Sequence, residues 1–222
     1  MSHKGAQRAW DRDGVAESIL QDVAIPEMIQ VRQVFDDTHI DDVERHVTEQ
    51  IEHSTVAGTI REGESIAIAV GSRGVAEIVE ITRALVHGIR RRKAKPFIVP
   101  AMGSHGGATS SGQLHVLHDL GITEDSVGAE IRSDMSTVRI GTTGSGLPVH
   151  IDKTAAGADG IIPIARIKPH TAFRGDYESG LMKMLAIGLA KQQGAEVTHS
   201  QGFERMAENV RDIAGVVLEK CC

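Results

Sequence analysis

Cysteine and aromatic side chains are scarce in this sequence of 222 residues. The only two cysteines, Cys221 and Cys222, are adjacent, which excludes a disulfide framework and a spaced zinc knuckle. Such cysteine usage fits a reducing cytoplasm. Aromatic residues make up only 3% of the chain, whereas glycine occurs 24 times. This composition favours an α/β domain with many tight turns between strands and helices over an aromatic-rich β-sandwich.

Long hydrophobic runs and an excess of positive charge are also missing. The start of the chain, "MSHKGAQRAWDRDGV", has no apolar core of a signal peptide, and nowhere does the sequence contain the roughly 18 uninterrupted apolar residues of a membrane span. We therefore expect a cytoplasmic protein with no membrane partner. The formal net charge of -6 argues against a nucleic-acid surface, so a small molecule is the expected partner.

The pattern of apolar residues predicts a polar N-terminal tail over residues 1–26, followed by one α/β domain over residues 27–222. Strands are expected at 27–36, 65–70, 96–101 and 160–167, and helices at 40–56, 75–90, 110–119, 178–190 and along the apolar stripe of Phe203, Met206, Val210, Ile213 and Val217. A short β-rich excursion is expected around 131–155. Alternating strands and helices predict a mainly parallel, Rossmann-like sheet with helices on both faces.

Ionisable residues follow three of the expected strands. Arg73 lies in "GSRG", His105 in "GSHGG" and His170 in "KPHT". Because ligands of parallel sheets bind beyond the carboxyl ends of the strands, these residues are expected to meet in one crevice. The guanidinium of Arg73 suits a carboxylate or a phosphate, although a short Gly-Ser turn with a purely structural role also fits this motif.

His105 and His170 can each give or take a proton near neutral pH. Two such groups on opposite sides of one carbon could invert a stereocentre. The same histidines also fit two alternatives, a pair of hydrogen-bonded loop residues or two ligands of one zinc ion.

Lys183 is unusual because it lies within the apolar stretch "LMKMLAIG". On a helix that is apolar nearly all round, its amine must reach solvent, pair with a carboxylate or stay partly desolvated. Glu178, five residues earlier, is a poor helical partner by spacing. A desolvated lysine has a lowered pKa and can form a covalent bond to a cofactor or a substrate, whereas a lysine that reaches solvent has no such role.

Five blocks of the sequence carry a family resemblance. They are "AVGSRGVAEI", "KPFIVPAMGSHGGATSSGQ", "GITEDSVGAEIRSDM", "RIKPHTAFRGDYESGLMKMLAIGLAKQQGA" and "THSQGF". From about residue 27 to the end, the chain resembles the N-terminal domain of the nickel-dependent lactate racemase family. Known members are about twice as long, so the resemblance implies that the family's C-terminal domain is absent from this chain, and we expect no activity from the chain alone.

The resemblance also implies roles for individual residues. Lys183 matches the lysine that carries a nickel-pincer nucleotide as a thioamide; this cofactor is a pyridinium-3-thioamide-5-thiocarboxylic acid mononucleotide with nickel. His199 of "THSQG" matches the histidine that ligates the nickel. His105 and His170 match the acid/base pair, and Arg73 matches the arginine that holds the substrate carboxylate.

The reaction implied by the resemblance is racemisation or epimerisation of a 2-hydroxy acid, which is lactate or a related hydroxy or sugar acid. One histidine removes the hydroxyl proton while a hydride passes to the cofactor, and return of the hydride to the other face inverts the centre. Proteins of cofactor synthesis are implied partners, and a homo-oligomer is left open. The chain departs from the family at Ala69–Ser72, Ala172 and Ala190, which leaves the identity of the hydroxy acid open.

Two other functions stay open on sequence grounds. A zinc hydrolase would use His105, His170 and His199 as metal ligands and would leave Lys183 unmodified. A non-catalytic domain that binds an anion or carries a cofactor would use the same pocket without turnover.

Overall fold

The computed structural model describes residues 14–24 and 27–221. Its contacts divide the chain into two units, Met1–His39 and Ile40–Cys222. The described part of the first unit contains one short helix, α1 (Val15–Leu20). All other helices and strands belong to the second unit, which contains every candidate site residue.

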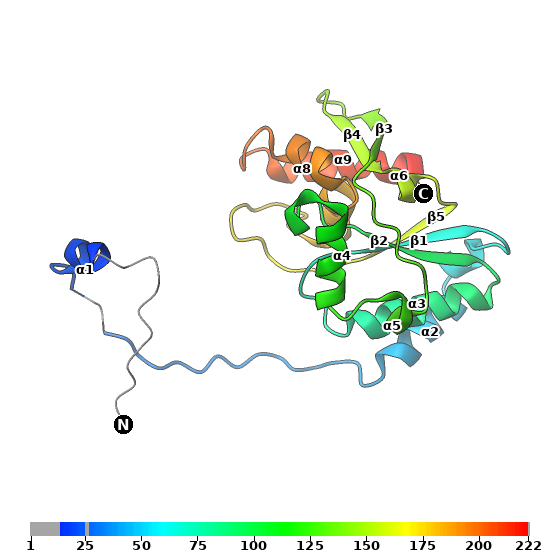
Figure 1. Cartoon of the computed structure of the whole chain (residues 1–222), viewed down its shortest axis with the longest axis horizontal. Helices are drawn as coiled ribbons and strands as arrows, with labels where there is room; N and C mark the ends of the chain where they lie inside the picture. Colours follow the sequence, from blue (N-terminus) through cyan, green and yellow to red (C-terminus); the bar gives the residue numbers. More distant parts are fainter. Residues whose placement is uncertain (1–13, 25–26, 222) are drawn as a thin grey trace. The chain divides into compact units, whose positions relative to one another are not determined.

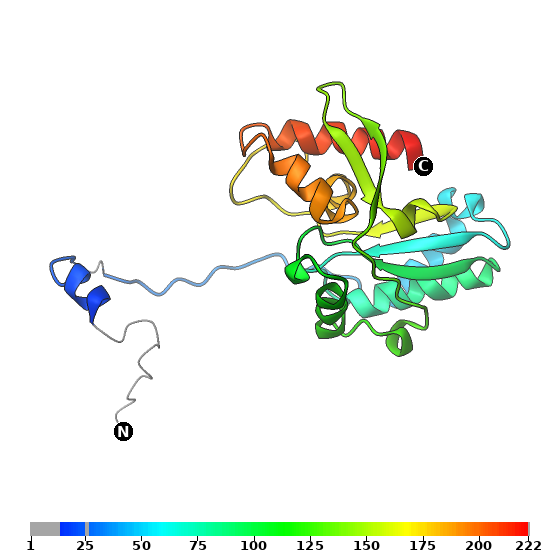
Figure 2. The same cartoon turned by 45° about the horizontal axis from the view of Figure 1, so that its top comes forward.

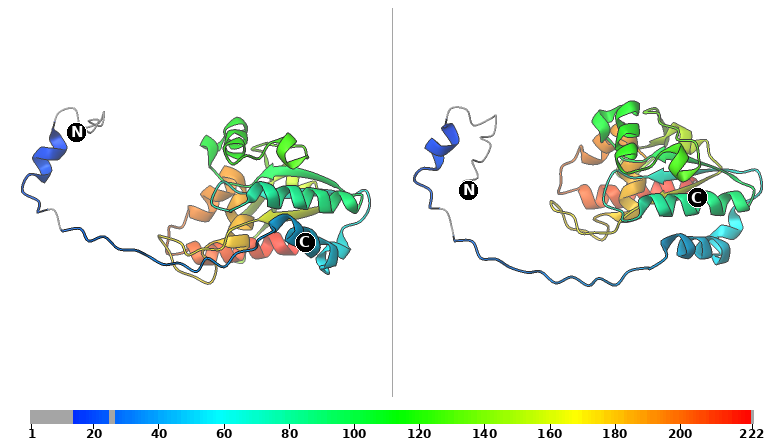
Figure 3. Two further views of the ribbon diagram at one scale, coloured as in Figure 1. Left: turned by 90° about the horizontal axis from the view of Figure 1, so that it is seen from below. Right: turned by 60° about the horizontal axis from the view of Figure 1, so that its bottom comes forward.

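The strand expected at residues 27–36 does not form. This segment has no regular secondary structure and runs as an extended thread, blue in Figure 3. Its apolar side chains are exposed, including Met28 at 89% and Val34 at 85%. β-branched residues raise the tendency to form a strand, but a strand also needs a hydrogen-bonded neighbour, and this segment has none among the described residues.

The second unit is built on a three-stranded parallel sheet in the order β2-β1-β5 (Figure 1). These strands are β1 (Ser65–Val70), β2 (Lys95–Pro100) and β5 (Gly160–Ile164). The register pairs Val70 with both Pro100 and Ile164, so all three strands end at the same edge. The parallel, Rossmann-like sheet predicted from the sequence is therefore confirmed.

Helices of the middle of the chain cover one face of this sheet. They are α2 (Val43–His53), α3 (Ile78–Arg91), α4 (Ser110–Asp119) and α5 (Glu124–Val127), with the short 3-10 turns η1 (Val56–Thr59) and η2 (Gly106–Ala108) beside them. The large residues Ile66, Ile68 and Val70 of β1 point into this layer, where they join one of the two apolar cores. Alternation along β1 explains this choice of face, because successive side chains of a strand point to opposite sides.

The other face is covered by the C-terminal elements and a hairpin, as Figure 2 shows for α9 in red. These elements are β3 (Thr137–Thr142), β4 (Pro148–Asp152), α6 (Lys153–Ala156), α8 (Lys191–His199) and α9 (Met206–Cys221). β1 presents only Ala67 and Ala69 to this second core. β3 and β4 pair antiparallel, which confirms the β-rich excursion expected around 131–155.

The single helix expected over residues 178–190 is interrupted. The chain forms α7 (Gly180–Lys183), then a π-helical turn η3 (Met184–Gly188), and α8 begins only at Lys191. The amide of Leu189 donates to the carbonyl of Met184, five residues earlier, which widens the helix. Lys191 has a positive φ of 53°, so the α-helical path cannot continue through it.

Two smaller expectations also need correction. β5 ends at Ile164 and lies at an edge of the three-stranded sheet, so it is only partly buried, and Ile167 is 87% exposed. The apolar stripe of the last helix is confirmed at Met206, Val210, Ile213 and Val217, but Phe203 precedes α9 and is 55% exposed.

Across residues 14–24 and 27–221, none of the helices combines the length and the hydropathy that a membrane span requires.

Candidate active site

Arg73 and His105 meet at the carboxyl ends of two neighbouring strands. Arg73 lies three residues beyond β1, and His105 lies five residues beyond β2. Nη2 of Arg73 is 3.5 Å from Nε2 of His105, and the hydroxyl of Ser72 contacts Nδ1 of the same ring. The expected convergence of these two residues is therefore present, and Ser72 joins them.

His170 is held by a long loop that follows β5. This loop, yellow in Figures 1 and 3, projects from the sheet before the chain enters α7. One carboxylate oxygen of Glu178 accepts the backbone N–H of His170 at 2.7 Å, and the other accepts the N–H of Gly175 at 3.2 Å. Arg174 lies 3.7 Å from Glu178 as an ion pair. Glu178 thus positions the His170 loop rather than pairing with Lys183, as its spacing indicated.

The ring of Phe173 links His170 to Lys183. Its centroid lies 4.3 Å from that of the His170 ring, and Nζ of Lys183 lies 5.9 Å from it, within the range of a cation–π contact. Phe173 is only 7% exposed. The buried ring therefore gives both candidate side chains a common apolar wall.

Lys183 is half-buried at the end of α7, and its amine has no carboxylate partner among the described residues. Burial lowers the pKa of Lys183, and the positive charges of Lys168 and Arg73 lower it further. A lowered pKa leaves more of the amine unprotonated at neutral pH, where it is a nucleophile. Of the readings that the sequence left open, the geometry favours a partly desolvated amine over a carboxylate-paired one.

Both histidines share this positive surrounding. Burial lowers the pKa of His105, with further lowering by Arg73 and Lys183. Burial also lowers the pKa of His170, where Lys183 and Lys168 add to the effect and Glu178 opposes it. Each imidazole is therefore held toward its neutral form, in which one nitrogen can accept a proton.

Two glycines lie at close contacts between the strand ends and the turn that follows Lys183. A Cβ on Gly71, directly after β1, would lie 2.9 Å from the methyl carbon of Met184, the neighbour of Lys183. A Cβ on Gly188 would lie 2.7 Å from the carbonyl oxygen of Ala101. The contact at Gly188 is with backbone, so only glycine there lets the π-helical turn approach the end of β2 this closely, whereas the Met184 methyl group opposite Gly71 could move aside.

His199 stands apart from this group. It is exposed near the end of α8, and its Nδ1–H donates to the carbonyl of Ala195 at 2.6 Å, which leaves Nε2 available for a metal. In the described part of the chain, no hydrogen bond or ion pair joins His199 to Arg73, His105, His170 or Lys183. Within the same residues, no three His, Cys, Asp or Glu side chains converge as a metal site.

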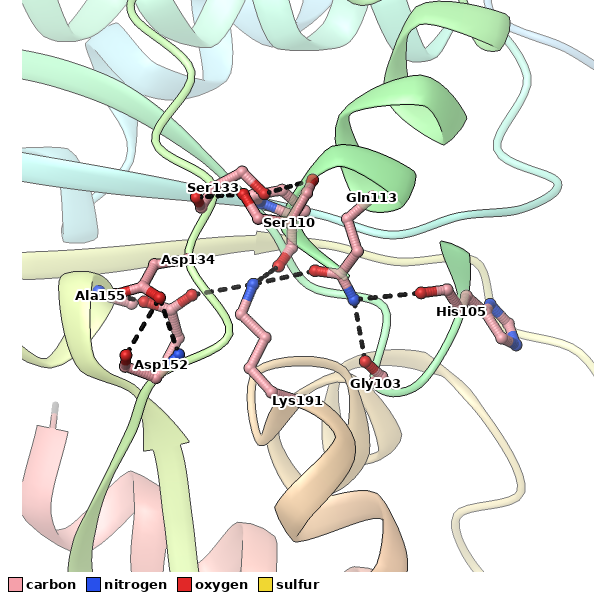
Figure 4. A network of polar contacts seen from close by, with 11 residues as sticks. Gly103, His105, Ser110, Gln113, Ser133, Asp134, Asp152, Ala155 and Lys191 are labelled. Atoms are coloured by element: carbon pink, nitrogen blue, oxygen red, sulfur yellow. Dashed lines mark hydrogen bonds and ion pairs between the residues drawn. The ribbon is translucent and has the colours of Figure 1, made fainter. Parts of the chain in front are cut away.

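Behind the site lies a buried polar network that the sequence reasoning missed (Figure 4). Lys191 is fully buried. Its ammonium donates to the carbonyl of Pro100 at 2.6 Å and to Gln113 Oε1 at 3.1 Å, and it lies 3.0 Å from Asp152 Oδ2 as an ion pair. The amide nitrogen of Gln113 donates to the carbonyls of Gly103 at 2.9 Å and His105 at 3.4 Å. The network thus supports the backbone that carries His105.

The fold and the site define an α/β protein whose strand ends gather cationic and titratable side chains around a half-buried lysine. The family model of the lactate racemase N-terminal domain matches residues 16–210, which is most of the chain and includes all five candidate residues. The chain belongs to this family. Among curated proteins, none matches it significantly.

Proposed function

We propose that this chain is the cofactor-bearing domain of a racemase or epimerase that acts on a 2-hydroxy acid. The observation that supports the proposal most is the convergence of Arg73, His105 and the unpaired Lys183 at the carboxyl ends of the parallel strands. A proton acceptor, a carboxylate-binding fork and a nucleophilic amine are the groups that such a reaction needs from the protein.

The site is suited to anions although the whole chain is acidic. In the described residues, Arg73, Lys168 and Lys183 have no ion-pair partner, and Glu178 is already engaged with Arg174 and the His170 loop. Uncompensated cations gathered around one site attract negative ligands. The proposed ligands, a 2-hydroxy acid and a nucleotide, bring a carboxylate and a phosphate.

The residues present fit a nickel-pincer nucleotide. Lys183 offers an amine of lowered pKa for covalent attachment, and His199 offers a free Nε2 to nickel, with its tautomer fixed by the carbonyl of Ala195. When bound, the cofactor would supply a reversible acceptor for the hydride of the substrate carbon. Loading would need the proteins of cofactor synthesis, and we infer a cytoplasmic setting.

The protein side chains would manage binding and protons. Arg73 would hold the carboxylate through its planar fork. His105 and His170, both kept toward the neutral form, would exchange the hydroxyl proton from the two sides. Phe173 would exclude water from one wall of the site.

The zinc hydrolase alternative has less support. A catalytic zinc site uses three protein ligands, and no such group exists within the described residues. The distinguishing experiment is metal retention in a host supplied with nickel and the cofactor pathway. Nickel should remain with the wild-type chain and be lost in Lys183→Ala, whereas a zinc site built from His105, His170 and His199 would keep its metal in that variant.

The result that would contradict the proposal is full retention of metal by Lys183→Ala together with loss in His105→Ala. His199→Ala should also lose nickel, and Lys168→Ala should keep it, because both proposed attachment points, Lys183 and His199, remain in that variant. For a loaded protein with turnover, loss of optical rotation from a single enantiomer separates racemisation from hydrolysis.

A further inference from the structure

The two nitrogens of the His105 ring contact different kinds of partner. Nε2 faces Nη2 of Arg73 at 3.5 Å, and a guanidinium can only donate hydrogen bonds. Nε2 therefore carries the lone pair. In the neutral ring the proton must then lie on Nδ1, which donates it to the hydroxyl oxygen of Ser72.

The His170 ring has the opposite arrangement. The backbone N–H of Ala172 donates to Nδ1 of His170 at 3.1 Å. A backbone N–H is always a donor, so Nδ1 carries the lone pair and the neutral ring has its proton on Nε2. The two histidines thus present opposite hydrogen-bonding characters at Nε2, a lone pair at His105 and an N–H at His170.

We propose that the two histidines begin the reaction in opposite neutral tautomers, and that Arg73 and Ser72 together make His105 the proton acceptor, with Ser72 as the positioning residue that receives the Nδ1–H. This inference rests on the proposed function and goes beyond it by assigning unequal starting roles to the pair. Ser72 contacts the ring rather than the substrate, and it acts through His105.

The position of Arg73 beside His105 relates the tautomer to the substrate. In a 2-hydroxy acid the hydroxyl is on the carbon next to the carboxylate. When Arg73 binds the carboxylate, the hydroxyl of one enantiomer comes to the neighbouring Nε2 of His105. The free protein is therefore set to accept a proton from the enantiomer whose hydroxyl faces His105, while His170 donates a hydrogen bond to an oxygen on its side.

Protonation would cost each ring one of its contacts. When the hydroxyl proton moves to Nε2 of His105, the ring becomes an imidazolium, and its Nδ1–H still donates to Ser72. Protonation of His170 would instead place a hydrogen on Nδ1 against the N–H of Ala172, so that contact must break first. At His105 the new Nε2–H would likewise face a donor, Nη2 of Arg73, so each ring keeps one partner and loses the other when it gains a proton.

Burial and the surrounding positive charges hold both rings toward their neutral form in the free protein. Arg73 and Lys183 face His105, whereas Lys183, Lys168 and Arg174 face His170 and only Glu178 opposes them. The direction of both pKa shifts is downward. The tautomer is consequently the property that distinguishes the two side chains near neutral pH.

Ring nitrogen chemical shifts test the assignment directly, because a protonated nitrogen and an unprotonated one resonate far apart. The experiment uses the full 222-residue chain labelled with ¹⁵N, without cofactor or substrate, at about pH 8, above the ordinary histidine pKa. His105→Gln and His170→Gln assign the signals. The expected spectrum shows His105 protonated on Nδ1 and His170 protonated on Nε2.

Ser72→Ala is the decisive variant, and Ser72→Thr is its matched control. In Ser72→Ala the His105 signals should move to the Nε2–H tautomer or to an average of the two, while those of His170 stay unchanged and report an intact fold. Ser72→Thr keeps a hydroxyl and should restore the Nδ1–H form. The proposal is overturned if wild-type His105 is an Nε2–H tautomer, or if Ser72→Ala leaves its tautomer unchanged.

The wild-type spectrum decides the tautomers even if Ser72→Ala does not fold. The measurement needs no cofactor and no turnover, so its failure is distinct from failure of the proposed function, which nickel retention tests. If the rings have opposite tautomers but the chain never retains nickel, the tautomer assignment stands and the proposed catalytic role fails.

Discussion

Two lysines eight residues apart in the sequence have opposite environments. Lys183 is half-buried beside the site, and no carboxylate pairs with it within the described residues. Lys191 is fully buried, and its ammonium contacts Asp152, Pro100 and Gln113. Burial lowers the pKa of both amines, but at Lys191 the charge of Asp152 opposes the shift.

This difference separates a lysine available for chemistry from one committed to structure. Lys191 donates hydrogen bonds to Pro100 and Gln113 and forms an ion pair with Asp152, and its side chain has no exposed surface. The amine of Lys183 has positive neighbours, which favour its neutral, nucleophilic form. We therefore expect substitution at Lys191 to change stability and substitution at Lys183 to change reactivity.

The largest expected effect is on the free energy of unfolding. Lys191→Met leaves Asp152 buried without its counter-charge, which should destabilise the domain by about 3–5 kcal/mol. Lys183→Met is the matched control and should cost less than about 1 kcal/mol, because no carboxylate loses a partner. Urea denaturation of both variants measures the difference, and equal losses would contradict the distinction between the lysines.

A smaller effect is expected from removing the second charge of the buried pair. Asp152→Asn keeps an oxygen for the N–H of Ala155, which now donates to Asp152 Oδ1 at 2.8 Å. Added to Lys191→Met, it should recover about 1–3 kcal/mol, because no uncompensated charge remains. A double-mutant cycle measures this coupling, and simple additivity of the two single losses would refute it.

Reactivity should distinguish Lys183 in the unmodified protein. Its pKa is lowered, whereas Glu219 raises the pKa of Lys220. Acetylation followed at the peptide level over a range of pH should therefore show a lower midpoint for Lys183 than for Lys220. The pH midpoints are compared rather than the rates, because the rates also depend on how accessible each lysine is. A pH midpoint for Lys183 at or above that of Lys220 would argue against a desolvated amine.

The smallest expected effect is the pH dependence of stability that comes from His105. Its folded-state pKa lies below the unfolded value of about 6.5, so the unfolded chain binds more protons as the pH falls through that value. The contribution of His105 to stability is present above this pH and is lost below it. His105→Gln should make the fall in unfolding free energy between about pH 7 and 5.5 shallower. An unchanged slope would show that the pKa of His105 is not lowered in the folded protein.

Much of the fold could be predicted from local patterns. The runs at 65–70 and 96–101 are buried parallel strands followed by turns with Arg73 and His105, as the periodicity and the glycines indicated. The strand ends of a parallel sheet lie at one edge, so the convergence of these two residues follows from the order of the elements. The apolar surroundings of Lys183 also identified it as unusual.

What the sequence did not reveal depends on contacts between distant segments. Lys191 precedes the polar pair Gln192 and Gln193, a pattern typical of an exposed lysine, and only the fold brings Asp152 beside it. The contact between Ser72 and the His105 ring likewise joins residues that are 33 positions apart in the sequence. The strand predicted at 27–36 was wrong for the opposite reason: the local pattern was strand-like, but the fold provides no hydrogen-bonded neighbour among the described residues.

The most direct test of the account is to locate a cofactor on the chain. The protein would be produced in a host supplied with nickel and the cofactor pathway, and its intact mass and peptides would then be analysed. The account predicts an adduct on Lys183 with one nickel per loaded chain and none on Lys191. An adduct on another lysine, or a loaded chain with Lys183 unmodified, would contradict it.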